Sequence, residues 1–293
     1  MQEKIDPLIA ERAPWLFSGR PHHRLARAGL HRLLGYRKTL AIGAALEHLP
    51  TPAIMATMAE MLARDVEAKG LENLPADGPA LIVANHPTGI ADGIILWSIV
   101  ARIRPDLFIY TNSDILRVLP QMADLIVPVE WRLEKRTHAK TRETMTLTRA
   151  ALEAGRLGVI FPSGRLAKRR GLRLHEREWM PSAAMIARKF DVPVIPVNIR
   201  ARNSALFYLF DFIHPTLRDI TLFHETLNKA RQPYRVTLGR PIPAHSLPET
   251  SAGAIEHLKA ATLALAGPDR TAVSLVDMTR RPAWTRGLIK SPT

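Results

Sequence analysis

The chain reads ALIVANHPTGIADG from Ala80 to Gly93. The five apolar residues at the start of this segment predict a short buried strand. The Asn-His-Pro-Thr-Gly that follows is typical of a turn, because proline fixes one backbone φ angle and glycine permits another. Apolar residues then recur at helical length. The segment therefore predicts a strand, a turn and a helix, with His86 and Asp92 where the turn enters the helix.

His86 and Asp92 are the first candidate catalytic residues. In an α/β protein they would lie beyond the carboxyl end of a strand, where ligands usually bind. A histidine with an aspartate partner is a base whose tautomer and ring orientation can be fixed. Gly89 and Gly93 leave room for a ligand, and Asn85 adjoins the histidine. The structural alternative is that Asp92 only caps the helix.

Strands and helices alternate along the chain from Gly70. We expect strands at 80–84, 107–110, 125–129, 157–161, 192–199 and 234–238, and helices near 91–103, 113–119, 137–154, 182–190 and 252–265. The two prolines of Val192–Ile199 indicate an edge strand or a bulge. The alternation predicts an α/β fold with a mixed, largely parallel sheet covered by helices.

The chain divides into an N-terminal extension and an α/β domain. We expect residues 1–69 to be a mainly helical extension, 70–245 to be the α/β domain, and 246–293 to be a closing helix and tail. Within the extension, Arg24–Arg37 is basic and carries leucines at roughly helical spacing. This segment is either a basic amphipathic helix on an anionic membrane or a surface helix packed on the domain.

The composition is basic: 41 Lys and Arg against 27 Asp and Glu give a net charge of +14. Such a charge favours nucleic acid, anionic lipid headgroups or phosphate-bearing carriers. The aromatic content of 6% and the lack of a recognition motif argue against nucleic acid. No cysteine is present, which excludes a thiol nucleophile. No window holds about eighteen uncharged apolar residues, so no ordinary membrane-spanning helix is expected.

A second candidate site, Phe161-Pro162-Ser163-Gly164-Arg165, also follows directly after a predicted strand. The backbone N–H groups of such a turn suit a phosphate. The alternative is a solvated basic loop, since basic residues continue to Arg177. Two motifs at two strand ends favour a shared pocket. Its candidate substrate-binding residues are Asn85, Thr88, Gly89, Ser163, Gly164, Arg165, Lys168 and Arg169.

Together these motifs resemble the glycerolipid acyltransferase superfamily, which includes lysophosphatidic acid and glycerol-phosphate acyltransferases. Residues 85–92 are similar to its Asn-His-x4-Asp motif, and residues 161–165 are similar to its Phe-Pro-Glu-Gly-Thr-Arg motif. Residues 192–197 resemble its Val-Pro-Val-x-Pro-Val strand. Residues 126–129 with Arg132 are a faint middle motif. The resemblance covers roughly residues 70–245, which it identifies as an acyltransferase domain.

The chain departs from the family pattern at both main motifs. Five residues, rather than four, separate His86 from Asp92, a spacing that resembles ornithine-lipid acyltransferases. Ser163 stands where the family has Glu, and Arg165 stands one position early. In the family these residues are thought to hold the acceptor's glycerol phosphate. The resemblance therefore supports the transferase chemistry more than any particular acceptor.

The resemblance implies acyl transfer from an acyl-CoA or acyl-carrier-protein thioester to a hydroxyl of a lysolipid or glycerol-phosphate-like acceptor, as in phospholipid biosynthesis. His86 would take the hydroxyl proton while Asp92 orients its ring, with no acyl-enzyme, metal or bound cofactor. The implied partners are the acyl donor, the lysolipid and an anionic membrane surface, and not nucleic acid. The expected location is the cytoplasmic face of a bacterial inner membrane, as a peripheral protein.

Two other functions remain possible at this point. A catalytically inactive lipid- or acyl-carrier-binding protein of the same fold is the main alternative, because the altered third motif at Ser163 permits it. A serine hydrolase is disfavoured, because the chain has no Gly-x-Ser-x-Gly elbow.

Overall fold

The computed structural model describes residues 1–130, 137–267 and 270–279. Arg132 of the faint middle motif and the end of the predicted tail lie outside these ranges. A seven-stranded sheet in the order β1-β9-β8-β2-β5-β3-β4 forms the centre of the molecule. Its strands are β1 (Val66–Lys69), β2 (Ala80–Ala84), β3 (Phe108–Asn112), β4 (Ile126–Val129), β5 (Leu157–Ile160), β8 (Val194–Arg200) and β9 (Tyr234–Leu238).

Neighbouring strands of this sheet are parallel except for β8 and β9. The predicted α/β class, with a mixed and largely parallel sheet, is therefore confirmed. β2 is the middle strand, and all of its residues are buried. Leu81 and Val83 face one core and Ile82 faces the other. A strand covered on both faces reads as a continuous apolar run, which explains the unbroken segment at 80–84.

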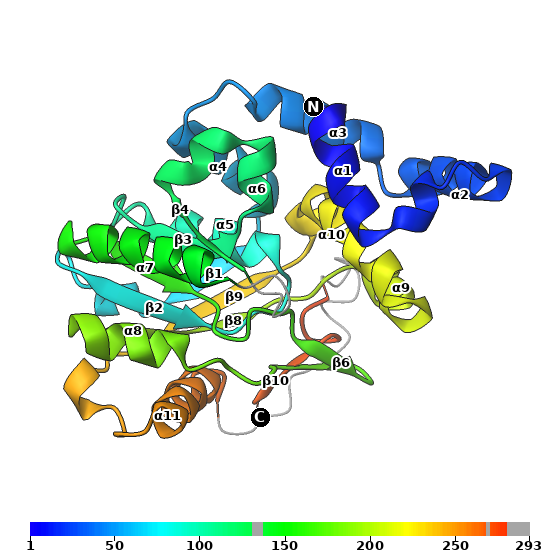
Figure 1. Cartoon of the computed structure of the whole chain (residues 1–293). Coiled ribbons are helices and arrows are strands. Elements are labelled where there is room, and N and C mark those ends of the chain that lie inside the picture. Colours follow the sequence, from blue (N-terminus) through cyan, green and yellow to red (C-terminus); the bar gives the residue numbers. More distant parts are fainter. Residues whose placement is uncertain (131–136, 268–269, 280–293) are drawn as a thin grey trace.

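Helices cover both faces of the sheet (Figure 1). α7 (His138–Glu153), α8 (Ser182–Phe190) and α11 (Ser251–Ala264) share the core of Leu81 and Val83. α5 (Ile90–Val100), with the shorter α6 (Asp114–Val118) nearby, belongs to the opposite core. These elements occur near their predicted positions, so the sequence pattern places the main layers correctly.

The N-terminal extension is helical, as predicted, but it is not separate from the domain. Its helices are α1 (Gln2–Arg12), α2 (Pro21–Leu33), α3 (Tyr36–Leu46) and α4 (Thr51–Leu62). Leu8 and Ile54 are buried in the same core as Ile95 of α5. The sequence does not predict β1, because its four residues include two charged ones. β1 pairs with β9, so the sheet begins inside the predicted extension.

The predicted edge position for the strand around Pro196 is wrong, but the alternative of a bulge fits, because the pairing shifts by one residue between Val197↔Leu238 and Val194↔Ile242. β8 lies between β2 and β9, inside the sheet. The carbonyl of Pro196 accepts a hydrogen bond from the N–H of Gly239 at 2.8 Å. The proline nitrogen therefore faces that same side, just beyond Leu238, where β9 ends. Its missing N–H costs no bond to β2, so an internal strand can accept the proline.

The segment predicted as a basic loop forms a hairpin instead. β6 (Lys168–Arg170) and β7 (Arg173–His175) pair antiparallel, and β10 (Ala272–Ser274) adds to β7. Leu174 is buried beneath this small sheet together with Val273. The charged residues of the hairpin hide the alternation of polar and apolar residues by which a strand is recognised. The third strand of the small sheet, β10, lies far away in the sequence.

Two further helices, α9 (Ala205–Ile213) and α10 (Pro215–Asn228), follow β8. Figure 1 shows α2 and α9 projecting from the same side of the molecule. Among the described residues, every helix is too short or too polar to cross a membrane.

Candidate active site

The two candidate catalytic side chains meet at the end of the central strand. His86 lies in the loop after β2, and Asp92 lies in the first turn of α5. The Nδ1 atom of His86 is 3.0 Å from Oδ2 of Asp92, and the Asp92 side chain is fully buried. Nδ1 is also buried and makes no aligned hydrogen bond, so the pair is in close contact without one.

Asp92 is held rigidly by the turn that precedes its helix. Its Oδ2 accepts hydrogen bonds from the backbone N–H groups of Thr88 and Gly89, at 2.8 and 3.0 Å. Its Oδ1 accepts the hydroxyl proton of Thr88. Asp92 therefore caps α5 and also faces His86, so the structural and catalytic interpretations of this residue are compatible.

Tyr234 of β9 continues this network into the core. Its hydroxyl is 2.9 Å from Oγ1 of Thr88, and its side chain is fully buried. Burial, and then the charge of Asp92, raise the pKa of Tyr234 well above its usual value. The phenol therefore stays protonated and can hydrogen-bond to Thr88, which holds the carboxylate of Asp92.

Asn85 fixes the other side of the loop. Its amide donates to the carbonyl of Ile199 at 2.8 Å and accepts from the N–H of Ile199 at 2.7 Å. The side chain thus ties the loop to β8, as a further residue of β2 would. Gly89 has a φ of +94°, and an added Cβ would lie 3.1 Å from the side chain of Leu166. This position needs glycine because the second loop packs directly against it.

The two predicted loops come together at His86. The N–H of Ala167 donates to the carbonyl of His86 at 2.9 Å, and the ring of Phe161 lies 4.3 Å from the imidazole, centre to centre. The N–H of Gly164 is used within its own turn, by the carbonyl of Phe161. Anion binding by this loop therefore depends on side chains more than on the backbone groups that its turn chemistry suggests.

A cavity of about 1990 Å³ adjoins the pair. Of the predicted site residues, those that line it are His86, Gly89, Gly164, Arg165, Lys168 and Arg169. The others are buried behind it: Asn85, Thr88, Asp92 and Ser163. This division separates side chains that can touch a ligand from those that support them.

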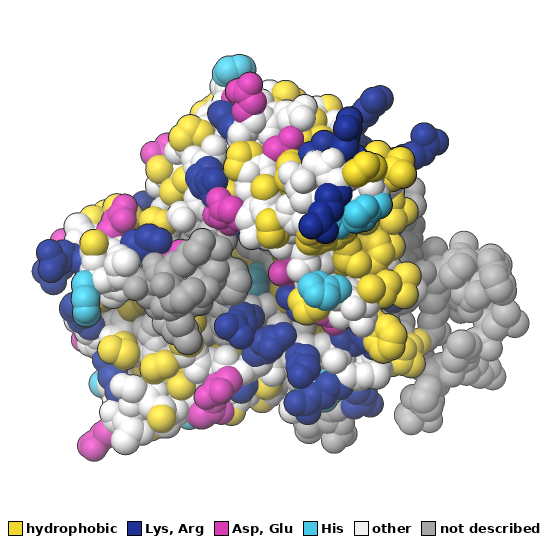
Figure 2. All heavy atoms as spheres, turned by 45° about the vertical axis from the view of Figure 1, so that its right-hand side comes forward, with side chains coloured by type: hydrophobic (Ala, Val, Ile, Leu, Met, Phe, Trp, Pro, Cys, Tyr) yellow, Lys and Arg dark blue, Asp and Glu magenta, His cyan; other side chains and the backbone are white. Residues whose placement is uncertain are grey.

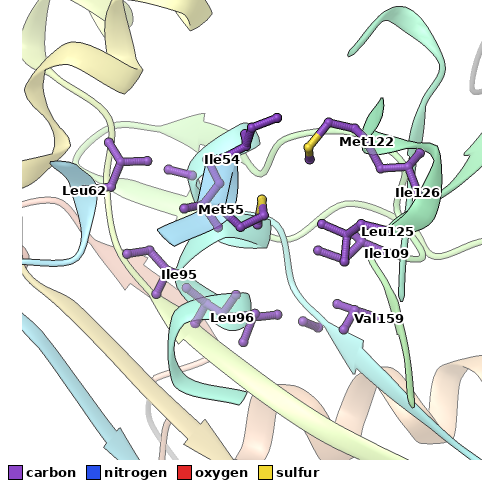
Figure 3. Packing of buried hydrophobic residues seen from close by; sticks show 14 of the residues in the cluster. Ile54, Met55, Leu62, Ile95, Leu96, Ile109, Met122, Leu125, Ile126 and Val159 are labelled. Atoms are coloured by element: carbon purple, nitrogen blue, oxygen red, sulfur yellow. The ribbon is translucent and has the colours of Figure 1, made fainter. Parts of the chain in front are cut away.

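One end of the cavity is apolar and the other is basic. The apolar end lies under the N-terminal helices, where Figure 3 shows Ile54 and Met55 of α4 opposite Met122, Leu125 and Ile126. The basic end adds two arginines that the sequence does not single out as ligands, Arg177 and Arg218. A volume well above the usual range of about 300–1,000 Å³ fits a long, flexible molecule with an anionic end.

Glu176 is the main residue near His86 that sequence reasoning misses. Its Oε2 accepts a hydrogen bond from the backbone N–H of His86 at 3.1 Å. Its Oε1 accepts from the indole N–H of Trp179, also at 3.1 Å. The signal available in the sequence is weak: an acidic residue next to Arg177 in a basic segment.

A histidine in contact with a buried carboxylate thus lies beside a long cavity that is apolar at one end and basic at the other, which suits an amphipathic anion. A family model described as acyltransferase matches residues 65–200. This part of the chain is therefore similar to that acyltransferase family, as the motifs predict.

Two curated relatives are also similar to this chain. The chain is 28% identical over 197 residues to the lyso-glycine lipid O-acyltransferase of Phocaeicola vulgatus, covering 65% of this chain and 69% of that protein. It is 28% identical to the enzyme of the same name from Bacteroides thetaiotaomicron, covering 63% and 68%. A similar structure is that of the 1-acyl-sn-glycerophosphate (LPA) acyltransferase PlsC from Thermotoga maritima. The TM-score is 0.48 at 13% identity, covering 89% of this chain and 95% of that one.

Proposed function

We propose that this protein transfers a fatty acyl group from a thioester donor to a hydroxyl of a lysolipid acceptor. The observation that carries the proposal is the contact of 3.0 Å between His86 and the buried Asp92 beside the cavity. The relatives named as lyso-glycine lipid O-acyltransferases support it and suggest the first acceptor to test.

The proposed reaction is a direct transfer. With Nδ1 of His86 facing Asp92, the other ring nitrogen, Nε2, takes the proton of the acceptor hydroxyl as its oxygen attacks the thioester carbonyl. Asp92 stabilises the imidazolium that forms. The tetrahedral intermediate then collapses, the carbon–sulfur bond breaks, and the leaving thiolate takes the proton from the imidazolium. The sequence contains no cysteine, so a Cys acyl-enzyme is ruled out.

The cavity suggests how the two ends of the substrates divide. The apolar end under α4 suits an acyl chain, because each buried methylene contributes about 0.8 kcal/mol. Arg165, Lys168 and Arg169 suit an anionic headgroup, or the phosphate of the phosphopantetheine arm that acyl-CoA and acyl carrier protein share. A guanidinium binds a carboxylate or a phosphate equally well, so the headgroup can be either.

We also infer a peripheral association with an anionic membrane, on the cytoplasmic face of a bacterial inner membrane. α2 has no buried residue and exposes Leu25 and Leu33. α9 exposes Leu209, Phe212 and Ile213 along one face. Figure 2 shows hydrophobic side chains gathered on this side of the molecule, with Lys and Arg around them. Apolar side chains among basic ones suit a surface of anionic lipid, where each basic residue adds about 1 kcal/mol.

The test of the proposed function is turnover by the purified protein, with lyso-glycine lipid and lysophosphatidic acid as acceptors. Acyl-CoA and acyl carrier protein are supplied as separate donors. We expect His86→Ala to lower kcat by about 10²–10⁴-fold, because the base is lost. Circular dichroism checks that the variant is folded. Wild-type turnover that survives in folded H86A would reject the mechanism. Binding of acyl donor without turnover would favour the inactive binding protein instead.

A further inference from the structure

Glu176 binds the backbone of His86, the proposed general base. Its carboxylate accepts from the N–H of His86 at 3.1 Å, and the carbonyl of His86 accepts from the N–H of Ala167 at 2.9 Å. Both backbone polar groups of His86 are thus bound by the segment between Phe161 and Trp179. The other carboxylate oxygen is bound by Trp179 at 3.1 Å, which fixes the acid itself.

The carboxylate also lies in a region where its charge acts on the imidazole. Burial raises the pKa of Glu176 above its usual value, although the hydrogen bonds from the His86 N–H and Trp179 and the charge of the His86 ring oppose this rise. The attraction is mutual, so a negative charge on Glu176 would stabilise positive charge that develops on the His86 ring during the reaction. The other charged groups nearby are Asp92 on α5, Arg165, Arg177, and Asp211 and Arg218 on α9 and α10.

The position of Glu176 also bears on the altered third motif. The resemblance places an acid at position 163, where this chain has Ser163. Ser163 is 6% exposed, and its hydroxyl, which donates to the carbonyl of Arg165 at 2.8 Å, is one of the groups that influence Glu176. A buried carboxylate is therefore present in this neighbourhood, but it comes from the end of the hairpin.

We propose that Glu176 is a positioning residue for His86. It fixes the main chain of the catalytic loop, and its negative charge favours the imidazolium that forms when the acceptor hydroxyl loses its proton. It thereby supplies, from position 176, a buried acid that the loop itself lacks at position 163. The proposal rests on the proposed role of His86 as the general base.

Glu176→Gln tests the proposal because it keeps the size of the side chain and removes the charge. We expect kcat to fall by about 10- to 100-fold, the effect of one charge-assisted hydrogen bond, with KM for both substrates within about twofold. We also expect the acidic limb of the kcat–pH profile to move to lower pH. In the acidic limb, kcat falls because the base is protonated to imidazolium. Without the carboxylate of Glu176, the imidazolium forms only at a lower pH.

Trp179→Phe is the matched control. It removes the other hydrogen bond to Glu176 but keeps its charge, so the acidic limb should stay at the wild-type pH. If E176Q unfolds, Glu176→Asp replaces it, because it keeps the charge but shortens the reach by one methylene. E176D should lower kcat and leave the limb in place, and a moved limb in that variant would count against the proposal.

A purely structural role for Glu176 predicts a different result. E176Q would then lose melting temperature and kcat with the limb unmoved, or would keep kcat within about twofold of wild type. Either outcome overturns the proposal. Activity in folded H86A would instead reject the role of His86, whereas an inactive H86A with a wild-type-like E176Q would reject only the role of Glu176.

Discussion

At the scale of single residues, Asp92 combines two tasks that sequence patterns usually present as alternatives. Its carboxylate accepts two backbone N–H groups at the start of α5 and contacts His86 with the same oxygen. The helix N-terminus favours a negative charge there by its dipole. The helix cap therefore also holds this fully buried carboxylate in contact with the imidazole of His86.

The hydroxyl of Tyr234 supports the carboxylate of Asp92 indirectly, through Thr88. Tyr234→Phe should destabilise the protein by about 1 kcal/mol, since it removes one buried hydrogen bond to Thr88 at 2.9 Å. We expect kcat to fall by about 3- to 10-fold, because Thr88 keeps its bond to Asp92 but loses its anchor. Urea unfolding and steady-state kinetics measure the two effects.

Thr148→Val is the control for this variant. It removes a buried hydroxyl of α7 that lies 2.9 Å from the hydroxyl of Tyr110 and does not line the cavity. A comparable loss of stability is expected there, with kcat unchanged. Equal losses of kcat in Y234F and T148V would mean that the network behind Asp92 has no special role.

The contact between the two candidate catalytic residues could be predicted from sequence because they are separated by one turn. His86 and Asp92 are joined by a local motif, so spacing alone brings them together. Glu176 could not be predicted, since it reaches His86 from 90 residues away through a hairpin with concealed alternation. Asn85 lies in the motif, yet its bonds to Ile199 depend on strand order, which no local pattern encodes.

At the scale of elements, a buried ion pair fastens α10 to the start of α9. Glu225 accepts hydrogen bonds from the N–H and the hydroxyl of Ser204, at 2.9 and 2.6 Å, and from the ammonium of Lys229 at 2.7 Å. Burial raises the pKa of Glu225, but Lys229 and Ser204 outweigh it, so the net pKa is lowered. The helices that carry one wall of the cavity therefore depend on an ionised Glu225.

This pair predicts a particular dependence of stability on pH. A carboxyl whose pKa is lowered in the folded state contributes stability above its unfolded pKa of about 4.3, and that stability is lost as the pH falls through the folded pKa. Wild type should therefore lose free energy of unfolding, below about pH 4.3, more steeply than Glu225→Gln. Urea unfolding at a series of pH values measures the slopes, and parallel slopes would contradict the expectation.

The elements themselves were predictable where one pattern dominates. β2 and α8 are apolar enough to be read directly, and both occur where they are expected. β1 and the hairpin were missed because their short strands carry charge, which periodicity reads as loop. Pro196 misleads for a different reason. A proline is excluded from an internal strand only when its nitrogen faces a residue of a neighbouring strand. Here the nitrogen faces the side of β9 just beyond Leu238, where that strand ends.

At the scale of the whole molecule, the structure shows where basic residues that contribute to the net charge of +14 lie. Arg165, Lys168 and Arg169 line the cavity, whereas Arg20, Arg24, Arg32, Arg37 and Lys38 are exposed on or near α2. The first group is suited to a substrate anion and the second to a lipid surface. Composition predicts the attraction to anions, but only the fold divides it between these two regions.

The exposed face of α9 provides the sharpest test of the proposed membrane contact. Phe212 and Ile213 are 79% and 58% exposed. Burial of such side chains contributes about 1.5–3 kcal/mol each, so Phe212→Ser with Ile213→Ser should weaken binding to anionic vesicles by more than about tenfold. Vesicle co-sedimentation measures this affinity. Leu147→Ser on α7, where the side chain is 39% exposed, is the control and should bind as wild type does.

A salt series separates the two contributions to this contact. Salt screens the basic residues around α2 but leaves apolar insertion by α9 largely unaffected, so raising salt should weaken wild type and the double variant by a similar factor. Turnover of a short-chain, water-soluble acceptor should be the same in both proteins, because Phe212 and Ile213 are exposed and do not line the cavity. Vesicle binding that salt abolishes and F212S/I213S leaves unchanged would mean that charge alone holds the protein, with α9 turned away from the lipid.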